Sequence, residues 1–413
     1  MQWRGVGQTH SGRQRDLNDD AHHCDDGRGL YVVADGLGDE KDSRLAATAA
    51  IQAAVTSVGA ALDAIDGEAD RAGLVEVVRQ AVLDAARDVY WLGHSGEERA
   101  GFGSSLTLVL VRDGFAVVAH VGDCRVYLVR EGSASQVTID HRLANELDEG
   151  EESAFEAPSQ RALIRMVGNQ PTVTVDAFSV DLLAHDRLLL CSDGMARHIE
   201  SEQWLAFQLK GDALDALAEE LIVHANDKGG EDNATVVLVA LDPSPGELER
   251  ERRRSTAVSG RLNALARVFL FQSLPVGLLS RVLTHCEVRK LAAGDVLIEE
   301  GAPCDQLVVV VKGALDVRRG DEVCGTIEAG GHTGAPTLLR PREARSTLQA
   351  VEKTTVIALH QLGFWTLVKA RPRLGINLLE RLVVELGREL DASIARLDDG
   401  RDDTNALDPY ERL

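Results

Sequence analysis

Two short apolar segments that each lead into Asp-Gly constrain the fold of this chain more than any other feature. Residues 30–34 precede Asp35-Gly36, and residues 188–191 precede Ser192-Asp193-Gly194. An apolar run of this length before a glycine predicts a buried strand that stops at a turn. Two such strands can place two carboxylates at one edge of a fold. The alternative is that each Asp-Gly is an ordinary tight turn, which is a common use of this pair.

The charge of the 413-residue chain is unevenly distributed. Residues 1–245 carry 42 acidic and 20 basic side chains, whereas residues 246–413 carry 24 of each. The N-terminal part therefore holds the whole net charge of −22, which argues against nucleic acid as a partner. An acidic excess could serve solubility alone. It also fits a metal site built from aspartates.

The pattern of residues 1–243 predicts an α+β domain. Residues 46–64 and 72–92 have helical spacing of apolar side chains and almost no helix breakers. Strands are predicted at residues 106–111, 115–121, 126–129 and 236–241, and a polar loop at residues 148–160. Together these elements predict antiparallel sheets covered by pairs of helices.

A break at Asp242-Pro-Ser-Pro-Gly246 ends this first domain. Residues 244–267 are predicted to form a charged helical linker, because acidic and basic residues alternate in its first part. Residues 268–397 carry short strand-like runs with glycine turns at 296–299, 307–311, 314–317 and 355–359. We expect a small β-roll with a helix before it at 271–283 and a helix after it at 374–397. Residues 398–413 form a polar tail.

The cysteines and the N-terminus bear on the compartment. The six cysteines are scattered, with no Cys-x-x-Cys, and four of them lie in or beside apolar runs. Free buried thiols in a reducing cytoplasm are therefore expected. The first twelve residues show no signal-peptide pattern, and no membrane-spanning stretch is expected.

Further carboxylates sit at the ends of other predicted strands. Asp232-Asn233 opens the last strand of the first domain, and Asp123 lies in a hairpin turn. Near the N-terminus, Arg15 stands beside the carboxylates of Asp19 and Asp20. Carboxylate and carbonyl oxygens are ligands of hard cations such as magnesium and manganese.

With these motifs, about residues 5–241 resemble the metal-dependent serine/threonine phosphatases of the protein phosphatase 2C, or PPM, family. The motifs that carry the resemblance are Gly12-x-x-Arg15-x-x-Asn18-Asp19-Asp20, Ala34-Asp35-Gly36-Leu37-Gly38, Gly103-Ser104-Ser105, Gly122-Asp123-Cys124-Arg125, Thr138-x-Asp140-His141, Leu190-Cys191-Ser192-Asp193-Gly194 and Asp232-Asn233-Ala234-Thr235. The resemblance implies a β-sandwich flanked by helices. It also implies two manganese or magnesium ions that activate water toward phosphoserine and phosphothreonine.

The resemblance also implies a role for each site residue. Asp35 would bridge both metals and the Gly36 carbonyl would bind one of them. Asp193 and Asp232 would complete the other metal. Asp19 would act through bound water.

Arg15 would hold the substrate phosphate with its bidentate guanidinium. Asp123, with Asp193, matches a weaker third metal position. Asp20 and Asn233 would support these ligands.

The sequence departs from the family pattern at three places, and it leaves the role of His141 open. Asp39-Glu40-Lys41 stands where the family often has a second glycine and a histidine, Asp19 replaces a longer Glu, and Cys124 replaces a serine. His141 could act as a general acid or could be a structural loop histidine. All the direct metal ligands are retained, so activity is expected.

Residues 268–395 resemble the cyclic-nucleotide-binding domain, with an altered ligand motif. Ala335, in Thr333-Gly334-Ala335-Pro336, replaces the Glu that takes the ribose hydroxyl in functional members. Losing that charge-assisted hydrogen bond costs roughly 1.5–3 kcal/mol. The expected ligand site is marked by Gly334, Ala335, Arg342 and Arg345. Either arginine could contact the phosphate of a ligand, and either could instead be an ordinary surface residue. Binding of cAMP or cGMP at signalling concentrations is not expected, which leaves another small ligand, docking or dimerisation.

The last predicted helix carries one apolar stripe, formed by Leu379, Leu382, Leu386, Leu390, Ile394 and Leu397. The stripe could pack on its own β-roll or form the seam of a homodimer. The chain is thus read as a cytoplasmic phosphoprotein phosphatase with a regulatory or docking module. The alternatives are a phosphatase-like binding protein and a phosphatase switched by cAMP or cGMP through the linker.

Overall fold

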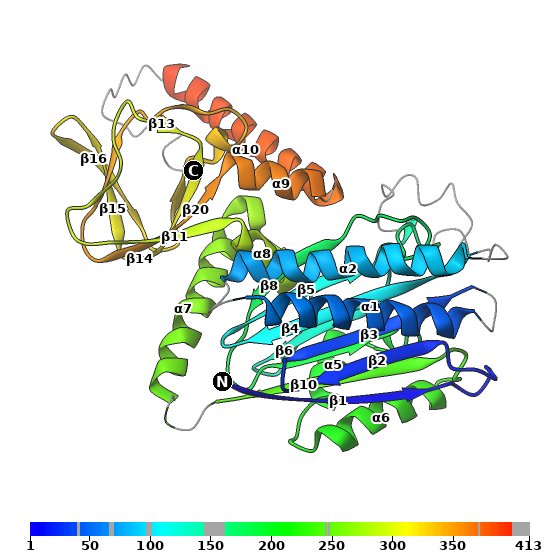
Figure 1. Ribbon diagram of the computed structural model, residues 1–413. Coiled ribbons are helices and arrows are strands. Elements are labelled where there is room, and N and C mark those ends of the chain that lie inside the picture. Colours follow the sequence, from blue (N-terminus) through cyan, green and yellow to red (C-terminus); the bar gives the residue numbers. More distant parts are fainter. Residues whose placement is uncertain are drawn as a thin grey trace. The chain divides into compact units, whose positions relative to one another are not determined.

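The computed structural model describes residues 1–38, 42–65, 70–95, 101–143, 162–243, 246, 248–370 and 372–398. The chain divides into two compact units, Met1–Arg252 and Arg253–Leu413 (Figure 1). The loop expected at 148–160, the departure at 39–41 and the tail after residue 398 lie outside the described residues. The expected α+β class is confirmed, with a sandwich in the first unit and a β-roll in the second.

The first unit is built on two five-stranded antiparallel sheets. The strands of one sheet, in pairing order, are β1 (Gln2–His10), β10 (Ala234–Asp242), β9 (Arg187–Cys191), β6 (Arg125–Arg130) and β7 (Ser133–Gln136). Those of the other are β2 (Asp20–Asp25), β3 (Leu30–Leu37), β4 (Gly103–Arg112), β5 (Phe115–Val121) and β8 (Asp176–Asp181).

Both faces of each sheet are covered, which explains why the strands read as continuous apolar runs. In β3, Tyr31 and Val33 pack against the opposite sheet, whereas Val32 and Ala34 pack against helices. Successive side chains of a strand point to opposite faces, so a strand buried on both faces is apolar at every position. The result is four layers: helices, sheet, sheet and helices.

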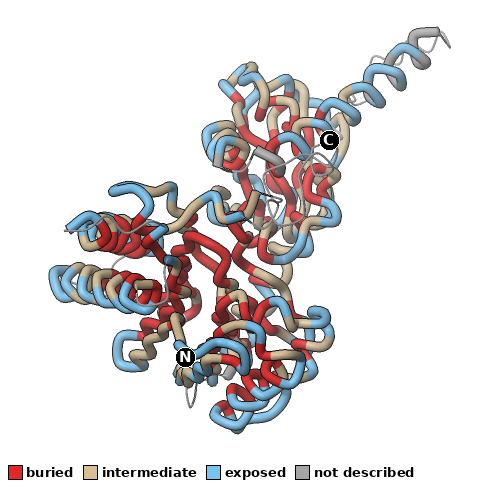
Figure 2. The backbone as a smooth tube through the Cα atoms, turned by 90° about the vertical axis from the view of Figure 1, so that its right-hand side faces the viewer, coloured by how far each residue is buried: buried red, intermediate tan, exposed pale blue. Residues whose placement is uncertain are grey.

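Within the described residues, five helices form the outer layers of the first unit. They are α1 (Ser43–Asp63) and α2 (Arg71–Gly93) on the sheet of β3, and α4 (Asp193–Ala196), α5 (Glu202–Gln208) and α6 (Leu214–Asp227) on the sheet of β10. By length and composition alone α1 is apolar enough to cross a membrane, which corrects the expectation that no stretch approaches this. Its buried face, with Ala46, Ala50 and Ala54, packs in the core of this unit. Figure 2 shows that buried and exposed residues alternate along the helices of the structure.

One strand end differs from the prediction. The first strand does not stop at Asp35 but continues to Leu37, because β2 and β4 pair with it on both sides as far as the Asp-Gly. Asp35 therefore lies within a sheet, directly opposite Asp20 of β2. The second strand does stop, and Ser192 becomes the N-cap of α4, whose first residue is Asp193.

The second unit contains a β-roll. Its strands are β11 (Cys286–Leu291), β12 (Val296–Ile298), β13 (Pro303–Cys304), β14 (Gln306–Lys312), β15 (Ala314–Arg319), β16 (Glu322–Glu328), β17 (His332–Thr333), β18 (Arg342–Glu343), β19 (Thr347–Ala350) and β20 (Thr354–His360). They pair as β11-β20-β14-β17, as β12-β19-β15-β16 and as β13-β18. A core that includes Val308, Leu315 and Val356 lies inside the roll. The short 3-10 helix η4 (Ala335–Leu338) follows β17.

Helices flank the roll. The charged linker is helical as α7 (Leu248–Arg267). The helix predicted at 271–283 is present as α8 (Val276–Thr284), but it begins five residues later than predicted, after the separate 3-10 turn η3 (Phe269–Phe271). Pro275 causes the break, because proline restricts the residue before it and itself serves as the N-cap of α8.

The last two helices are α9 (Gln361–Ala370) and α10 (Pro372–Asp398). Leu378 and Leu382 of α10 are buried in the core of this unit, together with the β14 and β20 faces. Leu390 and Ile394, further along the predicted stripe, are 55% and 47% exposed. The first part of the stripe thus packs on its own unit, and the second part does not.

Candidate active site

Aspartates from both sheets meet at one end of the sandwich. Burial raises the pKa of Asp35 well above its ordinary value, and the nearby charges of Asp20, Asp193, Asp123 and Asp232 raise that pKa further. The structure therefore brings together five carboxylates that the sequence separates by up to 212 positions. A cation is the simplest means of stabilising such a cluster in its charged form.

The two glycines of the Asp-Gly pairs are required by close backbone packing. A Cβ on Gly36 would collide with the main-chain carbonyl of Ser43, and a Cβ on Gly194 would collide with that of Asn233. Neither collision could be relieved by moving a flexible side chain. The tight-turn alternative therefore does not account for Gly36, which lies in a paired strand.

Asn233 joins the end of the domain to its beginning. Its Oδ1 accepts the backbone N–H of Asp19 at 2.7 Å, and its Nδ2 donates to the carbonyls of Ser11 and Leu17 at 2.8 Å each. These bonds hold the segment that carries Arg15, whose guanidinium lies 3.2 Å from Asp232.

The carboxylates of Asp19 and Asp20, beside this segment, differ in their hydrogen-bond partners. The Oδ1 of Asp19 is buried and has no hydrogen-bond partner among the residues that the structure describes. Ser192 Oγ donates to Asp20 at 2.6 Å and accepts the N–H of Thr235. Burial nevertheless raises the pKa of Asp20 to about 7.

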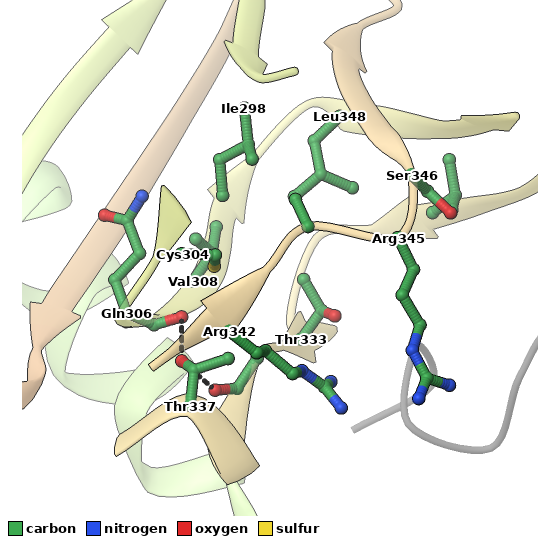
Figure 3. Close-up of a pocket in the computed structure, with 13 residues that line it drawn as sticks. Ile298, Cys304, Gln306, Val308, Thr333, Thr337, Arg342, Arg345, Ser346 and Leu348 are labelled. Carbon is green, nitrogen blue, oxygen red and sulfur yellow. Dashed lines mark hydrogen bonds between the residues drawn. The ribbon is translucent and has the colours of Figure 1, made fainter. Parts of the chain in front are cut away.

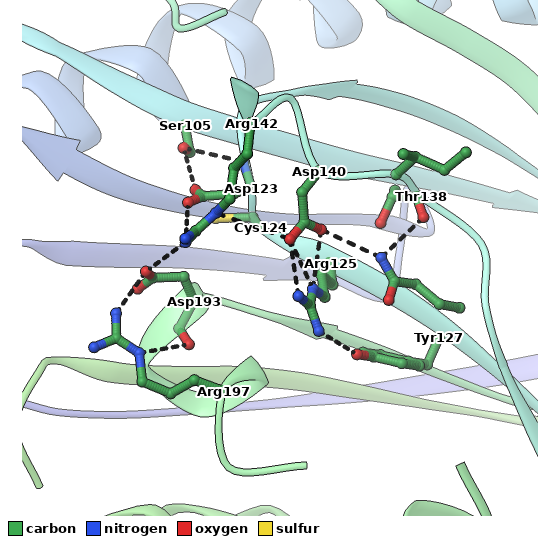
Figure 4. Close-up of polar contacts among 12 residues, drawn as sticks. Ser105, Asp123, Cys124, Arg125, Tyr127, Thr138, Asp140, Arg142, Asp193 and Arg197 are labelled. Atoms are coloured by element: carbon green, nitrogen blue, oxygen red, sulfur yellow. Dashed lines mark hydrogen bonds and ion pairs between the residues drawn. The ribbon is translucent and has the colours of Figure 1, made fainter. Parts of the chain in front are cut away.

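Two arginines that the sequence did not single out lie inside the aspartate cluster (Figure 4). Arg142 Nη2 lies 2.6 Å from Asp123 Oδ2 and 3.0 Å from Asp193 Oδ2. Arg197 Nη2 lies 2.6 Å from the same oxygen of Asp193 and 3.1 Å from Asp232 Oδ2. One signal could have found Arg197: it follows Asp193 by four residues, which places both on one face of a helical turn. Arg142 has no such signal beyond its place next to His141.

The contacts of His141 favour its structural role. It is buried, its N–H and its Nδ1 both bond the backbone of Gly122, and its Nε2 lies 3.4 Å from Asp176. The ring thereby fixes the turn that carries Asp123. A general acid would instead face the reacting phosphate.

Cysteine chemistry does not fit this end of the sandwich. Cys124 and Cys191 are buried free thiols, and burial raises the pKa of Cys191 to about 12. A thiol with such a pKa stays protonated and is a poor nucleophile at neutral pH. Neither thiol is therefore suited to act as the nucleophile of a reaction at this site.

The donor set fits divalent metal, although within the described residues no three side chains converge as a ready metal cluster. The donors are carboxylate and carbonyl oxygens, the ligands that magnesium and manganese prefer. No arginine or lysine among the described residues pairs with the Asp35 carboxylate, and the buried Oδ1 of Asp19 lacks a donor. A bound cation and its waters would satisfy both groups.

The second unit has a pocket of about 50 Å³ between the roll and the segment around η4 (Figure 3). Gly334, Arg342 and Arg345, three of the four residues of the predicted ligand site, are among those that line it. Ala335 does not line it, because its side chain is buried in the core with the helices. No acidic side chain is among the described residues that line this pocket, and the buried Oε1 of Gln306 has no hydrogen-bond partner among them.

Comparisons with known proteins agree with this geometry. Residues 6–233 match the family model described as protein phosphatase 2C, and residues 288–371 match the cyclic nucleotide-binding domain. The serine/threonine phosphatase stp of Listeria welshimeri is 32% identical over 242 residues, which cover 56% of this chain and 93% of that protein. The protein phosphatase PhpP of Streptococcus pneumoniae is 30% identical over 247 residues, which cover 59% of this chain and 97% of that protein.

Two solved structures have a similar fold. The Mycobacterium tuberculosis serine/threonine phosphatase PstP has a TM-score of 0.51 at 26% identity, over 59% of this chain and 100% of that one. The Streptococcus agalactiae serine/threonine phosphatase has a TM-score of 0.51 at 27% identity, over 58% of this chain and 100% of that one.

Proposed function

The chain belongs to the protein phosphatase 2C family of metal-dependent serine/threonine phosphatases, and we propose that its aspartate cluster binds two manganese or magnesium ions for the hydrolysis of phosphoserine and phosphothreonine in proteins. One observation carries the proposal. The Asp35 carboxylate is surrounded by four other aspartates and forms no ion pair with a described cation, since Arg197 acts on it only from a longer distance. Two divalent ions, when bound, would offset the phosphate charge and lower the pKa of a water between them.

Each residue of the cluster has a part in this proposal. Asp35 would face both ions, with the Gly36 carbonyl on one and the carboxylates of Asp193 and Asp232 on the other. Asp19 would accept a hydrogen bond from a water of the site through its unpartnered Oδ1.

Arg15 would grip two phosphate oxygens, which suits a half-exposed guanidinium 3.2 Å from Asp232. Asn233 and Asp20 would hold the ligands in position. The third metal expected at Asp123 is left out of this proposal, because Arg142 pairs with that carboxylate.

The competing function is a phosphatase-like protein that only binds phosphorylated partners. The full chain should hydrolyse p-nitrophenyl phosphate and a phosphothreonine peptide with manganese, and chelation should abolish both activities. Asp193→Ala should lose both while its circular dichroism spectrum stays that of the wild type. A full chain that binds the phosphopeptide with manganese present but releases no phosphate would establish the binding protein instead.

The C-terminal module is proposed not to bind cAMP or cGMP at signalling concentrations. Its pocket of about 50 Å³ is small beside the ~300 Å³ of ordinary ligand pockets, and no acidic side chain is among the described residues that line it. Arg342 and Arg345, whose guanidinium groups extend to one side of the pocket in Figure 3, favour another small anionic ligand or a docking role. Calorimetry that gives a sub-micromolar Kd for cAMP would overturn this.

A phosphatase switched by cyclic nucleotide remains the second candidate, and the linker helix α7 would be its transmitter. A ligand can switch the enzyme only if it binds two conformations with different affinity. The deciding measurement is the phosphatase activity of the full chain with and without 100 μM cAMP or cGMP. A change above twofold would favour the switch, and no change would favour docking.

Self-association through α10 is also part of the proposal. Ile376, Val383 and Leu390 are 54%, 64% and 55% exposed and recur every seven residues, the spacing of a coiled-coil position. This seam shares only Leu390 with the predicted stripe, whose Leu382 is buried in the core of the unit. Sedimentation of the full chain beside Val383→Glu tests it: a dimer that the variant dissociates supports it, and a monomeric wild type refutes it.

The domain limits and the compartment belong to the same proposal. We keep residues 1–243, 244–267, 268–397 and 398–413 as phosphatase domain, linker, cyclic-nucleotide-binding-like domain and tail. The two compact units and the helical α7 support these limits. A cytoplasmic location fits the six free cysteines, because oxidising compartments favour disulfides.

A further inference from the structure

Both carboxylate oxygens of Asp123 are already engaged by the protein. Ser105 Oγ donates to Oδ1 at 2.8 Å, and Arg142 Nη2 lies 2.6 Å from Oδ2. Asp123 is almost fully buried, so its remaining surroundings are protein rather than water. It thus differs from Asp35, whose carboxylate has no described cation partner.

Backbone hydrogen bonds of its two neighbours fix the main chain at Arg142, and a second carboxylate, that of Asp193, contacts its guanidinium. His141 and Leu143, on either side of it, donate backbone hydrogen bonds to Gly122 and Ala162 at 2.7 and 2.9 Å. Its Nη2 also contacts Asp193 at 3.0 Å. The side chain is only 22% exposed, so the pair is protected from most solvent screening.

An arginine here supplies a permanent positive charge between two aspartates. A guanidinium stays protonated at any pH that proteins tolerate, and it binds carboxylates in a fixed geometry. A divalent ion bound by Asp123 and Asp193 would have to displace it and would meet its charge at close range. The carboxylate oxygens that Arg142 holds cannot serve both cations at once. Arg197 also bridges two carboxylates, those of Asp193 and Asp232, but its side chain is 39% exposed and can turn into solvent when an ion binds, whereas that of Arg142 is more enclosed.

We propose that Arg142 is a built-in cation at the Asp123–Asp193 position, so that the chain binds two divalent ions and excludes a third. The inference rests on the proposed two-metal site of Asp35, Gly36, Asp193 and Asp232. Arg142 is a positioning residue in this scheme: it holds Asp193 by Oδ2, with no partner recorded for Oδ1 within the described residues.

The test is the number of manganese ions bound per chain, measured on the full chain by isothermal calorimetry and by equilibrium dialysis with metal analysis. The wild type should bind two. Arg142→Ala and Arg142→Met, which keeps the aliphatic stem, should each bind a third ion more weakly. Arg142→Lys should still bind two, because it keeps a cation at this position.

Two controls assign any extra ion to this position. Asp123→Asn combined with Arg142→Met should return the count to two. Arg71→Met removes a guanidinium whose partner is Asp181, at 2.8 Å, rather than a member of the cluster, and it should leave the count at two.

The outcomes separate this inference from the proposed function. A wild type that binds three ions, or Arg142 variants that bind only two, would overturn the inference and leave the two-metal phosphatase standing. A wild type that binds no manganese would overturn both. Two ions in the wild type and three in the Arg142 variants, with the third lost on Asp123→Asn, would establish it.

Discussion

The backbone N–H of Asp19 donates to Oδ1 of Asn233 at 2.7 Å, so the first and last carboxylate motifs of the phosphatase unit are joined by one side chain. The same amide donates to the carbonyls of Ser11 and Leu17, and Asn233 is almost fully buried. Asn233 therefore helps to set where Arg15 and Asp19 stand relative to Asp232, together with the backbone bonds of Arg13 and Gln14 to Gly230.

Asn233→Ala should destabilise the first unit and weaken catalysis together. It removes the partner of three partly buried backbone groups, the N–H of Asp19 and the carbonyls of Ser11 and Leu17, which should cost ~1–3 kcal/mol of unfolding free energy. The KM for a phosphopeptide should rise, because Arg15 loses its fixed position. Thermal unfolding and steady-state kinetics check both effects. The change should leave the metal ligands chemically intact, so a variant with wild-type KM and Tm would contradict the bridging role.

Gly36→Ala should prevent correct folding of the sandwich. The added methyl group would collide with the main-chain carbonyl of Ser43, where α1 begins, and neither β3 nor α1 can move without disturbing the core. Gly101→Ala is a useful comparison, because space around Gly101 is open and only its positive φ is strained. Soluble expression and circular dichroism distinguish the two. A Gly36→Ala protein as stable as the wild type would show that the contact is easily relieved.

The sequence predicted the layers and most of the cluster for physical reasons. Strands such as β3 and β9 are apolar at every position because helices or the other sheet cover both faces, and this pattern is local. The aspartates could be aligned because each lies in or within a few residues of such a strand, although Asp35 proved to lie inside β3 rather than at its end.

What the sequence could not predict depends on long-range contacts or on single backbone angles. Arg142 enters the cluster because His141 bonds to Gly122, a contact between residues 19 positions apart. The break before α8 follows from the placement of Ser273 at φ +63° and of Pro275, and the helical pattern of the region hides it. Ala335 faces the core because η4 turns it there, which no local pattern indicates.

Manganese affinity should rise with pH through the region around pH 7. The pKa of Asp20 is raised to about 7, so this carboxyl holds a proton below that pH in the metal-free protein, and the raised pKa of Asp35 acts in the same direction. A cation favours the deprotonated form, so each displaced proton weakens apparent affinity about tenfold per pH unit below its pKa. Calorimetry between pH 5.5 and 8.5 measures this. Asp20→Asn should make manganese affinity depend less steeply on pH near pH 7, because it removes one proton that the metal displaces. An unchanged dependence of affinity on pH would contradict the role of Asp20 as the proton-binding group.

The stability of the β-roll should fall on acidification because of His332. Burial lowers the pKa of His332 to about 4, from an ordinary value of 6.5, and its Nε2 is buried without a hydrogen-bond partner in the described part of the chain. The unfolded chain binds this proton first, so stability is intact above pH 6.5 and is lost as pH falls from 6.5 to 4, by at most ~3 kcal/mol. His332→Gln stays neutral at all these pH values. Its free energy of unfolding should change with pH as that of the wild type does above pH 7, and should fall less than that of the wild type below pH 6. Calorimetric unfolding at pH 7.5, 6 and 5 checks this, and parallel curves for the two proteins down to pH 5 would contradict it.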